Sequence, residues 1–167
     1  LALKLAPMSG GAIPDGHTAS LESTSYDSSK GLAHASGSNV CELEVDTGTG
    51  EVKLLNYSVA HDCGKKINPL IVEGQIIGGV VHGIGNALFE EMIYDDNGQP
   101  QTTNYGEYLL PLATEMPPIN IVHQETASPL NPLGLKGAGE GGTIPAAGAI
   151  VAAIENALQE FDVVIGM

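Results

Sequence analysis

Residues 70–91 read LIVEGQIIGGVVHGIGNALFEE, a helical pattern of apolar side chains that five glycines interrupt. Each interior glycine costs a helix about 1 kcal/mol relative to alanine, so intrinsic propensity cannot stabilise this helix. The segment therefore predicts a helix that is held by packing against other parts of the protein.

One face of this helix carries polar groups. On a wheel of 100° per residue, Gln75, Gly79, His82 and Asn86 fall within about 60° of one another. The stripe predicts close contact with whatever lies against it, and two partners remain open: a ligand, or a second helix that the small residues allow to approach. A membrane span is not expected, because Glu73 and the polar stripe keep the apolar run short of the roughly 20 residues required.

A second glycine-rich segment, residues 135–143, reads LKGAGEGGT and places one carboxylate, Glu140, among four glycines. Glycine lets the backbone adopt left-handed angles and approach a ligand, and the free amides of the helix that follows add a positive end beside the acid. Glu140 is therefore a candidate base. The plain alternative is an acid in a solvated loop.

Strands are expected between and before these segments. Residues 39–59 alternate partially around a turn at 46–50, which is typical of a β-hairpin. A second hairpin is expected around a turn at 95–98, with arms at 92–94 and 101–110, and a further strand at 119–125.

An alanine-rich helix is expected at residues 146–160, with Thr143 as its N-cap and Pro145 in its first turn. Its apolar residues surround most of the circumference, which predicts a buried helix. The predicted fold class is α+β, with mixed β-hairpins packed against the glycine-rich helix and the alanine-rich C-terminal helix. Residues 1–38 are expected to be a loop-rich connector, and residues 39–167 the folded domain.

Charge and composition limit the function classes. The 167 residues carry 6 basic and 20 acidic side chains, a net charge of −14 that opposes binding to nucleic acid or an anionic membrane. The hairpin register separates Cys63 from the partner of Cys41 by roughly seven residues, so we expect free thiols and a cytoplasmic location. No metal site is expected, because no two histidines have the helical spacing of a metal pair. The histidines are His17, His34, His61, His82 and His123.

Three segments, in this order and spacing, resemble the C-terminal half of the molybdenum-binding large subunit of the xanthine dehydrogenase and aldehyde oxidase family. They are HDCGKKINP at 61–69, IVEGQIIGG through GIGNAL at 71–88, and PLNPLG at 129–134 leading into 136–143. The likeness runs from about residue 31 to residue 158 and points to the prokaryotic branch of carbon-monoxide-dehydrogenase-like or aldehyde-oxidoreductase-like large subunits.

The resemblance implies roles for four residues. Glu140 matches the family's active-site glutamate, the base that takes the proton from the hydroxyl attacking the substrate carbon. Gln75 matches the glutamine that hydrogen-bonds the molybdenum cofactor, Gly139 matches the glycine before the base, and Gly79 is expected to line the same cavity. No role carries over to His82, which stands where many relatives have glutamine.

The implied function is that of a C-terminal portion of a molybdenum hydroxylase, acting on an aldehyde, a nitrogen heterocycle or carbon monoxide with water as the oxygen source. The implied cofactor is molybdopterin in its cytosine dinucleotide form. The family's large subunit is several times longer, so the expected partners are the remaining molybdenum-binding polypeptide, an iron–sulfur subunit and a flavin (FAD) subunit of a prokaryotic complex. The alternatives are a non-catalytic assembly module, or an independent phosphate- or nucleotide-binding domain.

Overall fold

The computed structural model describes residues 24–28 and 31–166, and the chain divides into two units, Leu1–Lys30 and Gly31–Met167. In the first unit, residues 24–28 are exposed and contain no helix or strand. All the elements below belong to the second unit. Its first strand begins at Ser36, and the division of the chain into a connector at 1–38 and a domain at 39–167 stays a prediction.

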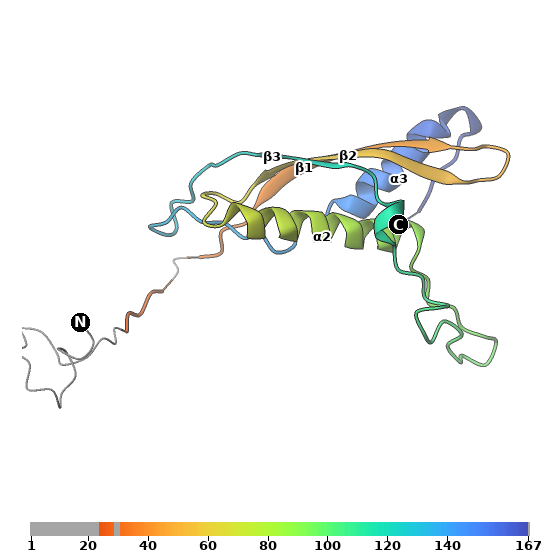
Figure 1. Ribbon diagram of the computed structural model, residues 1–167, viewed down its shortest axis with the longest axis horizontal. Coiled ribbons are helices and arrows are strands. Elements are labelled where there is room, and N and C mark those ends of the chain that lie inside the picture. The colour runs from red at the N-terminus through yellow and green to blue at the C-terminus, as the bar shows by residue number, and fades with distance from the viewer. Residues whose placement is uncertain (1–23, 29–30, 167) are drawn as a thin grey trace, which may run out of the picture. The chain divides into compact units, whose positions relative to one another are not determined.

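A three-stranded mixed sheet forms one layer of the second unit (Figure 1). Its strands are β1 (Ser36–Val45), β2 (Val52–Asp62) and β3 (Ile119–His123). β1 and β2 form the predicted antiparallel hairpin, closed by a turn in which Asp46 Oδ1 accepts the Gly48 N–H at 2.8 Å and Gly50 has a φ of +80°. β3 pairs with β2 in parallel, an arrangement that the sequence analysis did not anticipate.

A β-bulge explains why the alternation in β2 is only partial. The register shifts between Glu42 and Leu43, which leaves Leu55 without a partner in β1. Side chains alternate with a period of two, so one extra residue changes which positions face the core. The core-facing residues of β2 are Val52, Leu54, Tyr57 and Val59. The same register places Cys41 opposite Tyr57, and both Cys41 and Cys63 are free.

The glycine-rich segment forms helix α2 (Pro69–Leu88), as predicted. Asn68 Oδ1 accepts the N–H of Ile71 at 3.3 Å, and Pro69 occupies the first turn, where a missing N–H costs nothing. The helix ends three residues before the predicted boundary, because the carbonyl of Gly85 accepts the N–H groups of both Phe89 and Glu90.

The alanine-rich segment forms helix α3 (Ala146–Ala157), followed by a short 3₁₀ turn (Gln159–Phe161). The expectation that Thr143 is its N-cap was wrong: Pro145 occupies that position, and the Thr143 carbonyl accepts the Ala146 N–H at 3.2 Å. The expectation of a fully buried helix was also wrong for this chain. Only the stripe of Ala146, Ile150 and Ile154 is buried, because the sheet and α2 cover one side of α3.

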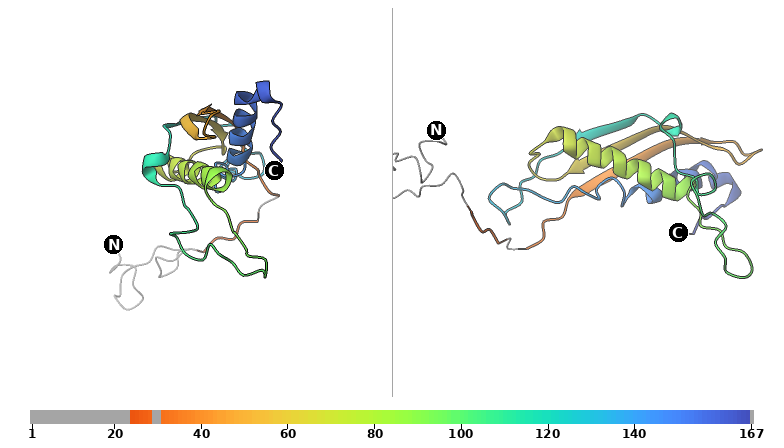
Figure 2. Two further views of the ribbon diagram at one scale, coloured as in Figure 1. Left: turned by 90° about the vertical axis from the view of Figure 1, so that its right-hand side faces the viewer. Right: turned by 60° about the horizontal axis from the view of Figure 1, so that its bottom comes forward.

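Both helices pack on the same face of the sheet, so one core lies between the two layers (Figures 1 and 2). The buried members of this core are Tyr57, Val59, Ile76, Val80, Ile84, Ala146, Ile150 and Ile154. The core contains one aromatic ring among aliphatic side chains, as the low aromatic content predicts.

The second predicted hairpin is reduced to a tight turn. One isolated bridge joins Tyr94 to Pro100, and the Gln101 N–H donates to the Ile93 carbonyl at 2.7 Å. Pro100 has no N–H to donate, so the ladder does not extend into strands. The fold class is α+β as predicted, with a three-stranded mixed sheet in place of two hairpins. No helix in the described part of the chain combines the length and apolarity that a bilayer span requires.

Candidate functional site

The loop that carries Glu140 is open to solvent. Glu140 is exposed and lines a hollow of about 280 Å³. The hollow is lined by Ala33, His34, Ala35, Gly137, Ala138, Gly139, Glu140, Gly141 and Ile144. Nothing lies within 4 Å of the position that a Cβ on Gly139 would occupy. Within the described residues, the backbone N–H groups of 138–141, which line this hollow, donate no hydrogen bond, so the loop carries free donors beside a carboxylate.

The first end of this loop is fixed to the end of β2. The Lys136 N–H donates to the Cys63 carbonyl at 2.9 Å, and an isolated bridge joins Gly64 to Leu135. Gly64 has a φ of +69°, and a Cβ at this position would overlap the Gly134 carbonyl oxygen. Glycine is required here both for the backbone angle and for the close approach.

Asp62, the last residue of β2, strengthens the same junction. Its carboxylate accepts the Gly64 N–H at 2.8 Å and the Lys136 ammonium at 3.1 Å, and it also bonds Thr126. Burial of Asp62 works to raise the pKa of its carboxyl, but these hydrogen bonds and the Lys136 charge outweigh it and lower the pKa below its usual range. Asp62 is therefore ionised and ties three segments of the chain together.

The second end of the loop lies against α2. A Cβ on Gly142 would overlap the Ile76 carbonyl oxygen, and a Cβ on Gly79 would lie 2.8 Å from the Thr143 nitrogen. One turn further along, a Cβ on Gly83 would overlap the Cβ of Ala146. The glycines of α2 at 79 and 83 therefore permit close backbone packing, which was one of the two explanations left open. The assignment of Gly79 to a cofactor stays a prediction.

The remaining residues of the polar stripe face outward. Gln75, His82 and Asn86 are exposed, and nothing lies within 4 Å of a Cβ added to Gly74 or Gly78. Gln75 directly precedes Ile76, whose carbonyl contacts the Glu140 loop, so both candidates lie at one end of α2. Neither Gln75 nor Gly79 lines the hollow beside Glu140, so the cavity that they were expected to share is not closed by this chain. Their roles, like those of Glu140 and Gly139, stay predictions.

A buried pair of histidines was missed by the sequence analysis. His61 is 2% exposed, and the parallel register of β2 and β3 places His123 directly beside it, with ring centroids 6.5 Å apart. Neither ring nitrogen of His61 has a hydrogen-bond partner in the part of the chain that the structure describes. Burial and His123 lower the pKa of His61, against an opposing effect of Asp62, so the ring is neutral. The two histidines become neighbours only through the parallel pairing of β3 with β2, so a prediction of that pairing would have been needed to find them.

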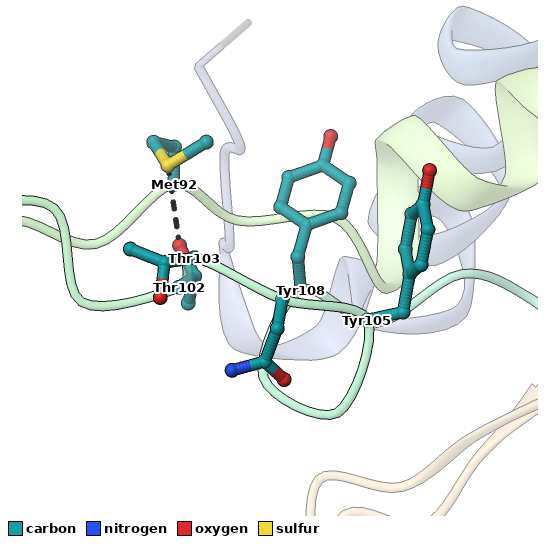
Figure 3. A pocket seen from close by; sticks show the side chains of 6 residues that line it. Met92, Thr102, Thr103, Tyr105 and Tyr108 are labelled. Carbon is teal, nitrogen blue, oxygen red and sulfur yellow. Dashed lines mark hydrogen bonds between the residues drawn. The ribbon is translucent and has the colours of Figure 1, made fainter.

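A separate hollow of about 370 Å³ lies in the segment after α2 (Figure 3). Tyr105 and Tyr108 line it together with Met92, which accepts a hydrogen bond from Thr102 Oγ1 at 3.3 Å. None of the predicted site residues lines this hollow. In residues 24–28 and 31–166, no group of three or more His, Cys, Asp and Glu side chains could hold a metal ion.

Comparison with known proteins agrees with the resemblance seen in the sequence. The profile of a family described as the molybdopterin cofactor-binding domain matches residues 12–117. The gamma subunit of the 6-hydroxypseudooxynicotine dehydrogenase complex of Paenarthrobacter nicotinovorans is 46% identical over 125 residues, which cover 74% of this chain and 16% of that protein. The large subunit of nicotine 6-hydroxylase from the same organism is 42% identical over 153 residues, covering 91% of this chain and 19% of the relative.

The fold is also similar to solved structures. The crystal structure of quinoline 2-oxidoreductase from Pseudomonas putida 86 superposes with a TM-score of 0.76 at 46% identity, covering 78% of this chain and 17% of that one. The chain therefore spans less than a fifth of the length of the relatives it matches.

Proposed function

The chain belongs to the molybdopterin cofactor-binding domain family, and on that premise we propose that it supplies the catalytic base and part of the cofactor site of a molybdenum hydroxylase. It is homologous to the large subunits of molybdenum-dependent hydroxylases and dehydrogenases. The observation that carries the proposal is the exposed Glu140 carboxylate, in a loop with free backbone donors whose two ends are fixed to the sheet and to α2.

The residues present fit an anionic pterin cofactor. The free N–H groups of 138–141 can donate to phosphate or oxo groups, and Gly139 leaves open space where a side chain would otherwise stand. Gln75, exposed at the same end of α2, would add an amide donor. Lys136 is already paired with Asp62 at 3.1 Å, so the loop offers backbone dipoles rather than a free lysine charge.

Within this site, Glu140 acts as the general base. When bound, the molybdenum cofactor supplies the oxygen to be transferred and accepts two electrons from the substrate. In the net reaction, a substrate C–H group and one water would give C–OH, two protons and two electrons, with the electrons passing to the cofactor. Glu140 would take the first of these protons at its carboxylate.

The favoured substrate class is a nitrogen heteroaromatic compound. Relatives named for nicotine and for quinoline are 42% and 46% identical to this chain, and both names denote nitrogen heterocycles. Hydroxylation of a ring carbon next to nitrogen suits attack by an oxygen nucleophile, because the nitrogen withdraws electron density from that carbon. Aldehydes and carbon monoxide are the other substrates that the resemblance left open.

The proposal includes the other parts of the complex. The rest of the molybdenum-binding polypeptide would close the site around Gln75 and Glu140, while iron–sulfur and flavin (FAD) proteins would carry the electrons away. The cytosine dinucleotide form of the cofactor and a cytoplasmic location, the latter expected from the free Cys41 and Cys63, belong to the same proposal. A non-catalytic assembly module would instead purify in the complex without molybdenum.

The substitution Glu140→Gln tests the proposal, because the amide keeps the shape of the side chain and removes the proton acceptor. In the complete complex we expect unchanged molybdenum and pterin content and a turnover number lowered about 10²–10⁴-fold. Glu160→Gln, at an exposed glutamate outside the loop, is the matched control and should retain wild-type turnover. A fully loaded Glu140→Gln complex with wild-type turnover would refute the role of Glu140.

A further inference from the structure

The imidazole of His61 lies against the residue that follows Glu140. A Cβ added to Gly141 would overlap His61 Nε2 and lie 2.8 Å from its Cδ2. Gly141 is therefore in contact with the edge of the ring, with no room for even a methyl group between them. This contact joins the end of β2 to the turn immediately after the proposed base.

His61 is held at the end of a paired strand. Its side chain is 2% exposed, and its carbonyl accepts the Gln124 N–H at 2.9 Å, which holds the strand beside β3. The ring of His123 stands edge-on at 6.5 Å, and His123 Nε2 is 3.4 Å from Glu73 Oε1. His61 and Gly141 also line a hollow of about 170 Å³, but the ring belongs to a paired strand whereas Gly139 and Glu140 are exposed, so we expect extra volume at Gly141 to move the loop.

The loop on the other side of this contact is short and otherwise open. Its first end is fixed at Lys136, and the carbonyl of Glu140 accepts the N–H groups of Thr143 at 3.1 Å and Ile144 at 3.2 Å. Between Lys136 and this turn, Gly137 donates to the Ala33 carbonyl at 2.9 Å, while Gly139 has nothing within 4 Å of its Cβ position. The contact of Gly141 with His61 therefore lies one residue from the Glu140 backbone.

We propose that His61 is a positioning residue that sets the location of the Glu140 carboxylate through its contact with Gly141. The inference rests on the proposed role of Glu140 as the base. His61 touches neither substrate nor cofactor in this scheme. The turn that follows Glu140 rests against the buried ring of His61. This contact matters for catalysis because a displacement of about 1 Å at a reacting group can lower the rate about 10²-fold.

The test is a size-compensation experiment in the complete molybdenum-loaded complex. Gly141→Ala alone should push the loop off the ring and lower kcat at least about tenfold, with little change in KM or molybdenum content. His61→Ala combined with Gly141→Ala removes the obstructing ring and should restore a large part of the lost kcat. If Gly141→Ala prevents assembly, the same double variant should restore assembly and molybdenum content.

His123→Ala combined with Gly141→Ala is the matched control, because His123 stands beside His61 and the three atoms nearest to a Cβ on Gly141 all belong to His61. No rescue is expected from it. Wild-type kcat in Gly141→Ala, a double variant no better than Gly141→Ala, or equal rescue by His123→Ala would each overturn the inference. Glu140→Gln separates the two proposals: if it abolishes turnover while the rescue fails, only the role of His61 is wrong.

Discussion

Lys136 Nζ lies 3.1 Å from Asp62 Oδ2, and this contact joins the end of β2 to the start of the Glu140 loop. The same ammonium donates to Thr126 Oγ1 at 2.7 Å. The side chains of Asp62 and Lys136 are 8% and 16% exposed, so the pair is shielded from solvent. The charge of Lys136 therefore holds the start of the loop in place by binding Asp62 and Thr126. The free backbone N–H groups of the loop remain as the donors beside the hollow.

Asp62→Asn should destabilise the chain by about 3 kcal/mol, because removing one partner leaves the Lys136 charge buried without its counter-ion. Thermal unfolding of the 167-residue chain, followed by circular dichroism at neutral pH, measures the effect. Asp62→Asn combined with Lys136→Met should recover part of the loss, since no unpaired charge then remains. A double variant as unstable as Asp62→Asn would show that the hydrogen bonds of Asp62, rather than the ion pair, hold the junction.

A nearby ion pair provides the control for that measurement. Lys66 Nζ lies 3.5 Å from Glu125 Oε1, with side chains 21% and 46% exposed. Exposed pairs contribute under about 1 kcal/mol because water screens them, so Glu125→Gln should shift the midpoint of unfolding far less than Asp62→Asn.

Adjacent glycines of α2 should respond in opposite directions to the same substitution. Gly79→Ala places a Cβ 2.8 Å from the Thr143 nitrogen and 3.0 Å from the Gly142 Cα, which are backbone atoms that cannot simply rotate away. Gly78→Ala meets nothing within 4 Å and should stabilise the helix by up to about 1 kcal/mol through improved propensity. In thermal unfolding, the midpoint of Gly79→Ala should therefore lie below that of the wild type and the midpoint of Gly78→Ala above it. Equal midpoints would mean that the loop does not lie against Gly79.

Gln75→Ala should lower the molybdenum content of the assembled complex without destabilising this chain. The Gln75 side chain is exposed, and alanine is the better helix former, so no folding penalty is expected. Asn86→Ala is the control: it is equally exposed, but it lies eleven residues, or about 16 Å, further along α2. Metal analysis of the two purified complexes decides the matter, and equal molybdenum content would remove Gln75 from the cofactor site.

Stability should fall as the pH drops below about 6.5, the ordinary pKa of histidine. Burial and His123 lower the folded-state pKa of His61, with Asp62 opposing, so the unfolded chain binds more protons in this range. The contribution of His61 is complete above about pH 6.5 and is lost as the pH falls toward its folded pKa. His61→Phe should reduce the difference in melting temperature between about pH 7.5 and 5.5. An unchanged difference would refute the assignment of this pH dependence to His61.

Particular elements could be predicted because their signals are local. The turn at Asp46–Gly50 and the two helical patterns depend on residues a few positions apart, and the structure contains all three features. The turn also sets the register of the hairpin. That register predicted that Cys41 and Cys63 lie too far apart for a disulfide, and both are free in the structure. The motifs at 61–69, 71–88 and 129–143 also indicate the family from the sequence alone.

Long-range relationships were decided only by the tertiary structure. The parallel pairing of β3 with β2 brings His123 beside His61, and nothing in either strand alone specifies it. The glycines of α2 predicted close contact, but only the packed fold shows that Gly79 and Gly83 face the loop and α3 while Gln75 faces outward. Local sequence sets propensity, turns and caps. Which buried surfaces meet depends on how the whole core packs, and that energy is shared among residues far apart in the chain.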